Sequence, residues 1–274
     1  LSSYQLLTTP NLKLDLATII NITPDHLDYH DNFDSYVKAK MNIIKSLKKK
    51  GKLIINNEDK PLKRYLKPYK NKKYNNVIFV ESNNNFPKIK NLPGKHNRII
   101  TQLAYTFCNL LGLNDKDIKK TFKNFQPLPH RLEIVFNSKK FLIINDSKAT
   151  NGESTAVALE SFKNIFWIAG GLSKQDGIGK AAEKFVNIKH IWLIGNSRNL
   201  FEKQILKVSS KIPINKFNNL HDAIFSIFKH KEIFNKNKIT ILFSPAAASF
   251  DQFKNFEERG NFFKKIVMKH IKEK

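Results

Sequence analysis

The segment Ser244–Ser249 has a composition that suits the binding of an anion. It directly follows an apolar run, Ile239–Phe243, that is typical of a strand, and a stretch rich in Ser, Asp and Phe comes after it. Small side chains let backbone N–H groups approach a ligand, and the N-terminus of a following helix favours negative charge. In open α/β sheets, ligands bind beside the carboxyl ends of the strands. The segment therefore predicts an anion site.

A second polar cluster follows the strand-like run Phe141–Ile144. Asp146 can accept hydrogen bonds from ribose hydroxyls, Lys148 can meet a phosphate, and Thr150 can donate to a carboxylate. An ordinary strand-to-helix turn with Asx capping is the alternative interpretation. After the next strand-like run, two glycines permit a tight turn that places Lys174 where it can hold a substrate carboxylate.

Thr23 and Pro24 predict the start of a helix, with the threonine as N-cap and the proline at the first helical position. Asp25 and His26 are then expected in the first turn, just past the strand-like run Ala17–Ile22. Histidine is a frequent ligand and general base, and aspartate supplies the hard oxygens that Mg²⁺ prefers. A capped surface turn with ordinary charged residues is the alternative.

Two further residues are candidates for contact with a nucleotide. Asn97 lies near the start of a long apolar helix, which it could instead simply cap. Arg131 follows Pro127 and Pro129, and a guanidinium held by such a rigid stretch suits bidentate contact with a phosphate or ribose. An arginine in a linker is usually just solvated, so both interpretations stay open.

The elements that must position these residues alternate between apolar runs and helical patterns, which indicates parallel α/β architecture. The predicted strands are Ala17–Ile22, Lys52–Ile55, Val77–Val80, Phe141–Ile144, Ile165–Ala169, His190–Ile194 and Ile239–Phe243. The clearest predicted helix runs from about His96 to Leu111 with Gly112 as its stop signal, and a short helix follows Asn114. We place a domain boundary in the proline-containing stretch, between residues 127 and 128.

The composition is that of a soluble globular protein with an excess of positive charge. Lys and Arg outnumber Asp and Glu by 48 to 23, which gives a formal charge of +25. Because the lysines are spread over the whole chain, we interpret them as solvated, with a nucleic-acid partner as the alternative. No apolar run approaches the ~18 residues of a membrane span. The single cysteine fits a reducing cytoplasm.

Several strings, taken together, resemble motifs of the Mur ligase family. They are Asn21–Asp28, Tyr36–Lys40, Gly94–Asn97, Leu128–Glu133, Asp146–Asn151, Gly170–Lys174 and Ser244–Gly260. Asp146–Asn151 and Ser244–Gly260 are similar to the branch of the family that adds D-glutamate. The resemblance covers essentially the whole chain. It implies an α/β fold with a partial P-loop-type ATPase central domain in residues 1–127 and a Rossmann-like C-terminal domain, with a mainly parallel sheet, in residues 128–274.

The resemblance also implies roles for individual residues. The expected metal ligands are His26 and Lys40, the latter carbamylated. The expected catalytic residues are His26, Lys40 and Lys148, and the expected nucleotide-binding residues are Asn97, Arg131 and Asp146. The expected substrate-binding residues are Ser2, Gln5, Thr150, Lys174, Ser249, Phe250 and Phe256. The family tends to have a further asparagine at the nucleotide base, whereas this chain has Ile100 at that position.

By the same resemblance, the chain is expected to come from a cytoplasmic enzyme that is monomeric when full length. The enzyme would use ATP and Mg²⁺ to join D-glutamate to UDP-N-acetylmuramoyl-L-alanine through an acyl phosphate, in peptidoglycan synthesis, without a nucleic-acid partner or a membrane span. The phosphate-loop pattern Gly-x-x-x-x-Gly-Lys-[Ser/Thr] does not occur in the sequence. We therefore expect a fragment without the N-terminal domain and phosphate loop, inactive alone. A related ligase such as a folylpolyglutamate synthase, or a basic nucleic-acid-binding protein, is the alternative.

Overall fold

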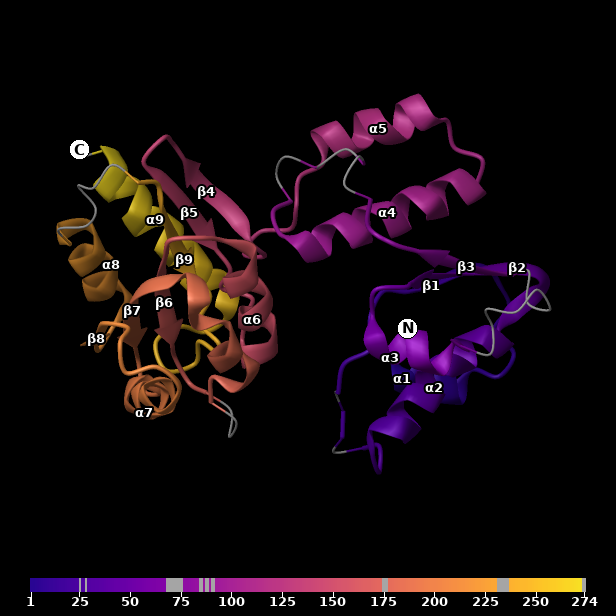
Figure 1. The fold of residues 1–274 in the computed structure, drawn as a ribbon, viewed down its shortest axis with the longest axis horizontal. Helices are drawn as coiled ribbons and strands as arrows, with labels where there is room; N and C mark the ends of the chain where they lie inside the picture. Colours follow the sequence, from indigo (N-terminus) through magenta and orange to yellow (C-terminus); the bar gives the residue numbers. More distant parts are fainter. Residues whose placement is uncertain are drawn as a thin grey trace. The chain divides into compact units, whose positions relative to one another are not determined.

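The computed structural model describes residues 1–24, 26–27, 29–67, 76–83, 86, 89, 92–173, 177–230 and 237–272. The chain forms two compact units, whose elements are labelled in Figure 1. The first unit comprises Leu1–Ile89 and Lys95–Asn124, and the second comprises Lys90–Gly94 and Phe125–Lys274. Among the described helices, none is long and apolar enough to cross a bilayer.

The first unit is built on a parallel sheet with the strand order β1-β2-β3. Its elements are α1 (Ser3–Thr8), β1 (Leu14–Ile19), α2 (Phe33–Lys45), β2 (Leu47–Asn56), α3 (Lys60–Tyr65), β3 (Val77–Val80), α4 (Lys95–Leu110) and α5 (Asp115–Asn124). In β2, Leu53 and Ile55 pack with residues of α2 and α3, whereas Ile54 packs with residues of α4. Because successive side chains of a strand point to opposite faces, this alternation buries β2 between helices on both sides.

Helix α4 ends close to the predicted stop signal. Gly112 adopts a φ of +79°. Its N–H donates to the carbonyl of Asn109 at 2.9 Å, and the N–H of Leu113 donates to the carbonyl of Cys108 at 3.2 Å. These two bonds form a Schellman motif, which satisfies carbonyl groups that the helix end leaves without helical partners.

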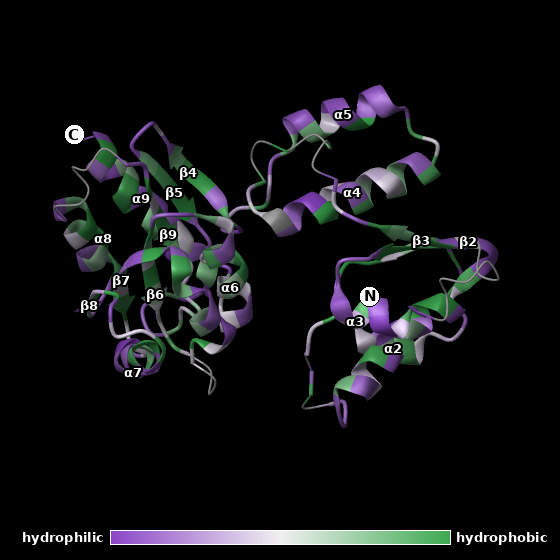
Figure 2. Cartoon of the chain, viewed as in Figure 1, coloured by the Kyte–Doolittle hydropathy of each residue, from purple (hydrophilic) through white to green (hydrophobic). Residues whose placement is uncertain are grey.

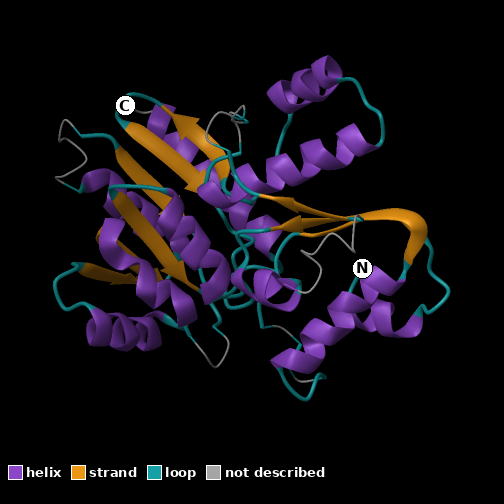
Figure 3. Cartoon of the chain, turned by 45° about the vertical axis from the view of Figure 1, so that its right-hand side comes forward, coloured by secondary structure: helices purple, strands orange, loops and turns teal. Residues whose placement is uncertain are grey.

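The second unit contains a six-stranded sheet with the order β4-β5-β9-β6-β7-β8. Its elements are β4 (Glu133–Asn137), β5 (Phe141–Asn145), α6 (Gly152–Ser161), β6 (Ile165–Gly170), the 3₁₀-helix η2 (Gly179–Asn187), β7 (Ile188–Ile194), α7 (Arg198–Val208), β8 (Ile214–Phe217), α8 (Leu220–Lys229), β9 (Ile239–Phe243) and α9 (Phe256–Lys272). Strand β4 is antiparallel to β5, and the other pairs are parallel. Figure 3 shows these strands in orange with helices beside them.

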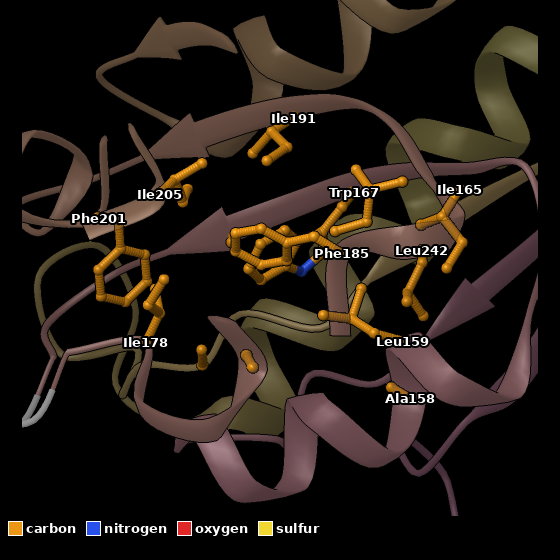
Figure 4. Close-up of a cluster of buried hydrophobic side chains, with 14 of the residues drawn as sticks. Ala158, Leu159, Ile165, Trp167, Ile178, Phe185, Ile191, Phe201, Ile205 and Leu242 are labelled. Atoms are coloured by element: carbon orange, nitrogen blue, oxygen red, sulfur yellow. The ribbon is translucent and has the colours of Figure 1, made fainter. Parts of the chain in front are cut away.

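Two hydrophobic layers cover this sheet. Trp167 belongs to a cluster with residues of α6, η2 and α7, whereas its neighbours Phe166 and Ile168 belong to a cluster with residues of α8 and α9. Figure 4 shows the first cluster, in which the ring centroids of Trp167 and Phe185 lie 5.9 Å apart. In Figure 2 the strands of this sheet are mostly green, whereas α5 of the first unit is mostly purple. The sheet is therefore a buried middle layer between helices.

All seven predicted strands are present, although β1, β2 and β7 begin earlier than predicted and β1 also ends earlier. Strands β4 and β8 were not predicted. The lysine-rich stretch that follows Lys45 forms the first half of β2.

Candidate functional site

The carboxyl ends of β5, β6 and β9 form the edge where most of the predicted residues of the second unit lie. Strand β9 lies between β5 and β6. The helices that follow β5 and β6 cover one face of the sheet, while α9, which follows β9, covers the other. Such a point, where neighbouring strands lead to opposite faces, opens a crevice in which α/β sheets bind ligands. The loops after these three strands thus form a candidate site.

Asp146, directly after β5, is held by groups of the protein itself. The N–H of Leu132 donates to its Oδ1 at 3.1 Å, and the hydroxyl of Ser244 donates to its Oδ2 at 2.8 Å. Burial raises the pKa of Asp146 to about 7, against the effect of these two bonds and of the positive charge of Arg131. The carboxyl group therefore ties the loops that carry Arg131 and Ser244 to the end of β5.

Arg259, in α9, is a buried arginine at this edge of the sheet that the sequence reasoning missed. Its side chain is 1% exposed. Its Nε and Nη2 donate to the Oγ and the carbonyl of Ser147 at 3.0 and 2.8 Å, and its Nη1 donates to the carbonyl of Ala247 at 3.0 Å. Burial lowers its pKa to about 10, which leaves the group positively charged at neutral pH. Arg259 thus connects the loop after β5 to the loop after β9.

Arg131 lies between two residues with left-handed backbone conformations, His130 at φ 63° and Leu132 at φ 45°. The N–H of His130 donates to Glu133 Oε2 at 3.0 Å, and Asn145 Nδ2 lies 2.9 Å from His130 Nδ1. These contacts fix the backbone on both sides of Arg131 while its own side chain is exposed. The guanidinium is therefore presented from a fixed turn, as the two prolines before it suggested.

Lys148 and Phe256 lie together, with the ammonium 3.8 Å from the centroid of the ring. Ser249 is buried, whereas Phe250 is 68% exposed. Thr150 is half-buried, and its N–H donates to the carbonyl of Lys148 at 2.9 Å. These predicted residues share the same edge of the sheet. Lys174, predicted beside them, lies outside the described residues.

In the first unit, Ser2 and Gln5 engage each other at the start of α1. The Ser2 N–H donates to Gln5 Oε1 at 2.8 Å, and the Gln5 N–H donates to Ser2 Oγ at 3.1 Å. This capping box satisfies two N–H groups of the helix end. Both polar side chains thus take part in capping α1.

His26 and Lys40 lie around one aromatic ring, that of Tyr36. The ring centroids of His26 and Tyr36 are 6.5 Å apart, and the Lys40 ammonium is 5.7 Å from the Tyr36 centroid. Lys40 Nζ also lies 3.4 Å from the carbonyl oxygen of Leu1. The structure therefore brings the two predicted metal ligands to the same side chain.

His30 is a buried histidine that the sequence reasoning passed over. Its Nε2 lies 2.9 Å from Ser3 Oγ, and its ring packs against those of Tyr4 and Tyr36 at centroid distances of 5.9 and 5.4 Å. Its contacts place α1 next to the His26 turn. The run of aromatic and histidine residues just after His26 was the available signal.

One local expectation and one alternative interpretation for the first unit are wrong. No described residue from Thr23 to Asn32 is helical, and His26 has a φ of 54°. Asn32, whose side chain accepts from the N–H of Ser35, is instead the N-cap of the next helix, α2. Asn97 lies inside α4 rather than before it, so it does not occupy the capping position.

The described residues do not fit a complete Mg²⁺ site. Mg²⁺ requires several oxygen ligands, whereas the side chains of His26 and Lys40 offer an imidazole and an amine. Within the described part of the chain, no group of three or more His, Cys, Asp or Glu residues gathers as a metal site would require. Asp25 and Asp28 of the same motif lie outside the described residues.

Two cavities of the first unit, both lined by described residues, are basic. One, of about 560 Å³, is lined by Asp15, Leu16, Lys48, Lys49, Lys50, Lys52, Leu110 and Leu111. The other, of about 440 Å³, is lined by Lys60, Lys63, Arg64 and Lys67. Neither lining includes a predicted site residue, so these two cavities do not identify the candidate site.

Comparison with known proteins identifies relatives along nearly the whole chain. Residues 2–109 match the family model of the Mur ligase middle domain. The UDP-N-acetylmuramoylalanine--D-glutamate ligase of Rickettsia felis is 32% identical over 297 residues, which cover 100% of this chain and 65% of that protein. The proteins of the same name from Fusobacterium nucleatum and Lawsonia intracellularis are 35% and 38% identical, over 98% and 100% of this chain.

The chain spans 65%, 66% and 60% of the lengths of these three relatives. Among solved structures, MurF ligase from Thermotoga maritima in complex with ADP matches 98% of the chain with a TM-score of 0.66 and 15% identity. UDP-N-acetylmuramate-alanine ligase MurC from the same organism matches 100% of it with a TM-score of 0.64 and 15% identity. At such low identity, the likeness to these two structures concerns the fold.

Proposed function

Because the chain belongs to the Mur ligase family, we propose that it forms part of an ATP-dependent ligase that joins D-glutamate to UDP-N-acetylmuramoyl-L-alanine. Residues 1–127 are the later part of its ATPase domain, and residues 128–274 are its C-terminal domain. The names of the relatives support this substrate pair. The observation that carries the proposal is the meeting of the loops after β5, β6 and β9 at the switch point of the second sheet.

The reaction has two steps. The terminal phosphoryl group of ATP is transferred to the alanyl carboxylate, which forms an acyl phosphate and releases ADP. The amine of D-glutamate then attacks the acyl carbon, and phosphate leaves through a tetrahedral intermediate. Both steps require positive charge near the phosphoryl group. In the second unit, Lys148 and Arg131 are the proposed sources of this charge, and both are held on fixed backbone.

The remaining predicted residues keep their expected roles in this proposal. Asn97 and Asp146 contribute to the nucleotide site, and Thr150, Ser249, Phe250 and Phe256 to the site of D-glutamate, together with Lys174. Ser2 and Gln5 contribute to the site of the nucleotide-sugar. His26 and carbamylated Lys40 belong to a Mg²⁺ site that needs further ligands. We place the protein in the cytoplasm as a monomer.

A kinetic experiment on Lys174 tests the amino-acid site. In the full-length protein, Lys174→Ala should raise the KM for D-glutamate roughly tenfold or more, because a carboxylate loses its cationic partner. The KM for ATP should stay within about twofold. Lys189→Ala, which removes an exposed lysine at the start of β7, is the matched control. Equal increases in both KM values would refute the role of Lys174. Ligation of another amino acid instead of D-glutamate would refute the substrate.

A further inference from the structure

The loop after β7, Gly195–Ser197, contacts the candidate site, although no predicted residue lies on it. The N–H of Ser197 donates to the carbonyl of Gly171 at 2.9 Å, and Ser197 Oγ accepts from the N–H of Ser173 at 2.7 Å. The N–H of Asn196 donates to Asp251 Oδ2 at 3.1 Å. This loop is thus bonded both to the loop after β6 and to the segment after β9.

The hydroxyl oxygen of Ser197 accepts from the Ser173 N–H and does not cap its own helix. Ser197 occupies the N-cap position of α7, where a serine normally accepts a hydrogen bond from an N–H of the first helical turn. Here its side chain makes no such bond. The Oγ of Ser197, which could cap α7, accepts from the N–H of Ser173 instead. Ser197 is buried, with 6% exposure.

The three loops pack so closely that they have little freedom to move separately. A Cβ added at Gly195 would come within 2.1 Å of Asp251 Oδ2, and one added at Gly171 would come within 2.3 Å of the carbonyl of Ala248. Leu172 and Ala248 exchange two backbone hydrogen bonds, both of 2.9 Å. A shift of the loop after β6 would therefore also displace Ala248, the residue before Ser249.

We propose that Ser197 is a positioning residue for the amino-acid site. By accepting the Ser173 N–H, it fixes Gly171–Ser173, and through the pairing of Leu172 with Ala248 it fixes Ser249. Ser197 touches no substrate and acts on binding through these loops. The inference rests on the proposed function, since it assigns the residues positioned by Ser197 to the recognition of D-glutamate.

The first test measures hydrogen exchange of the Ser173 amide in the chain, without substrate. Ser197→Ala removes the acceptor, so exchange at Ser173 should become about five- to tenfold faster, while Ser197→Thr should keep it slow. Ser209→Ala, at the other end of α7, is the matched control and should leave the Ser173 amide unaffected. Unchanged exchange in Ser197→Ala would overturn the proposal, whatever reaction the enzyme performs.

The second test measures kinetics in the full-length protein. Ser197→Ala should raise the KM for D-glutamate about five- to tenfold, with the KM for ATP and kcat within about twofold, and Ser197→Thr should restore it. A general loss of stability would instead lower the active fraction and leave both KM values unchanged, which would contradict a positioning role. If Ser197→Ala speeds up exchange at Ser173 but the enzyme does not use D-glutamate, Ser197 positions the loop as proposed. The assignment of that loop to the binding of D-glutamate is then refuted.

Discussion

Burial gives Asp146 a carboxyl group that changes its ionisation near neutral pH. Its pKa of about 7 lies above the ordinary 3.8, so between these values the folded state holds a proton that the unfolded chain has released. The free energy of unfolding therefore loses a contribution on the order of 1–4 kcal/mol as the pH rises from about 4 to about 7. The stabilising contribution is fully present only below the pKa of the unfolded chain.

Replacement of this carboxyl group tests the effect. The amide that Asp146→Asn introduces cannot titrate, so the stability of the wild type relative to this variant should fall as the pH rises from about 4 to about 7. Urea unfolding at several pH values measures this difference. Asp15→Asn, which removes an exposed carboxylate paired with Lys48, controls for the loss of one negative charge. A difference between wild type and Asp146→Asn that does not change with pH would contradict the expected ionisation.

Some residues of the site could be predicted from the sequence, and others could not. Polar residues after a predicted strand, such as Asp146 and Thr150, could be placed at the sheet edge because a parallel sheet gathers the carboxyl ends of its strands. Arg259 and Ser197 could not, since each acts through backbone carbonyls or N–H groups of distant loops. Contacts of this kind depend on tertiary packing, and residue type alone gives no signal for them.

At the scale of single elements, substitutions of Gly112 test whether its left-handed backbone conformation is what ends α4. In the variant Gly112→Ala, the backbone of the alanine would have to keep the φ of +79°. The added Cβ would meet no atom within 4 Å, so it would cause no steric clash. The variant should therefore lose about 1 kcal/mol of stability through backbone strain alone. Asparagine is tolerated better in this conformation, so Gly112→Asn should lose less. Urea unfolding of the chain measures both changes, and equal losses in the two variants would contradict strain as the cause.

In the second sheet, the strands that were predicted and those that were missed differ in their burial. Strands β6, β7 and β9 lie between two helical layers and appear as continuous apolar runs. Strands β4 and β8 form the two edges of the sheet, and β8 has two exposed residues, Asn215 and Lys216, at its centre. An edge strand has fewer neighbours to bury it, so its apolar pattern is short and broken. The false helix start at Thr23 had cap residues but no apolar face to pack.

At the scale of the whole molecule, the charge of +25 makes binding to nucleic acid the rival to be tested. We expect only non-specific affinity for duplex DNA, with a Kd of about 10⁻⁶ M or weaker at physiological salt. The lysines are spread over both units. Both tryptophans are fully buried, so neither tryptophan offers an exposed ring for stacking with bases. Fluorescence anisotropy over a range of salt concentrations measures this affinity. A Kd near 10⁻⁸ M at physiological salt would contradict the expectation.

The place of β9 in the second sheet has a consequence for biosynthesis. The ribosome releases β5 and β6 first, and β9, which must separate them, follows only after β7 and β8. At about 5–20 residues per second, several seconds of translation pass before this strand can insert. Until then, the facing edges of β5 and β6 lack their shared partner and are open to wrong pairing. A nascent chain of this protein therefore depends on a strand made later to protect those made before it.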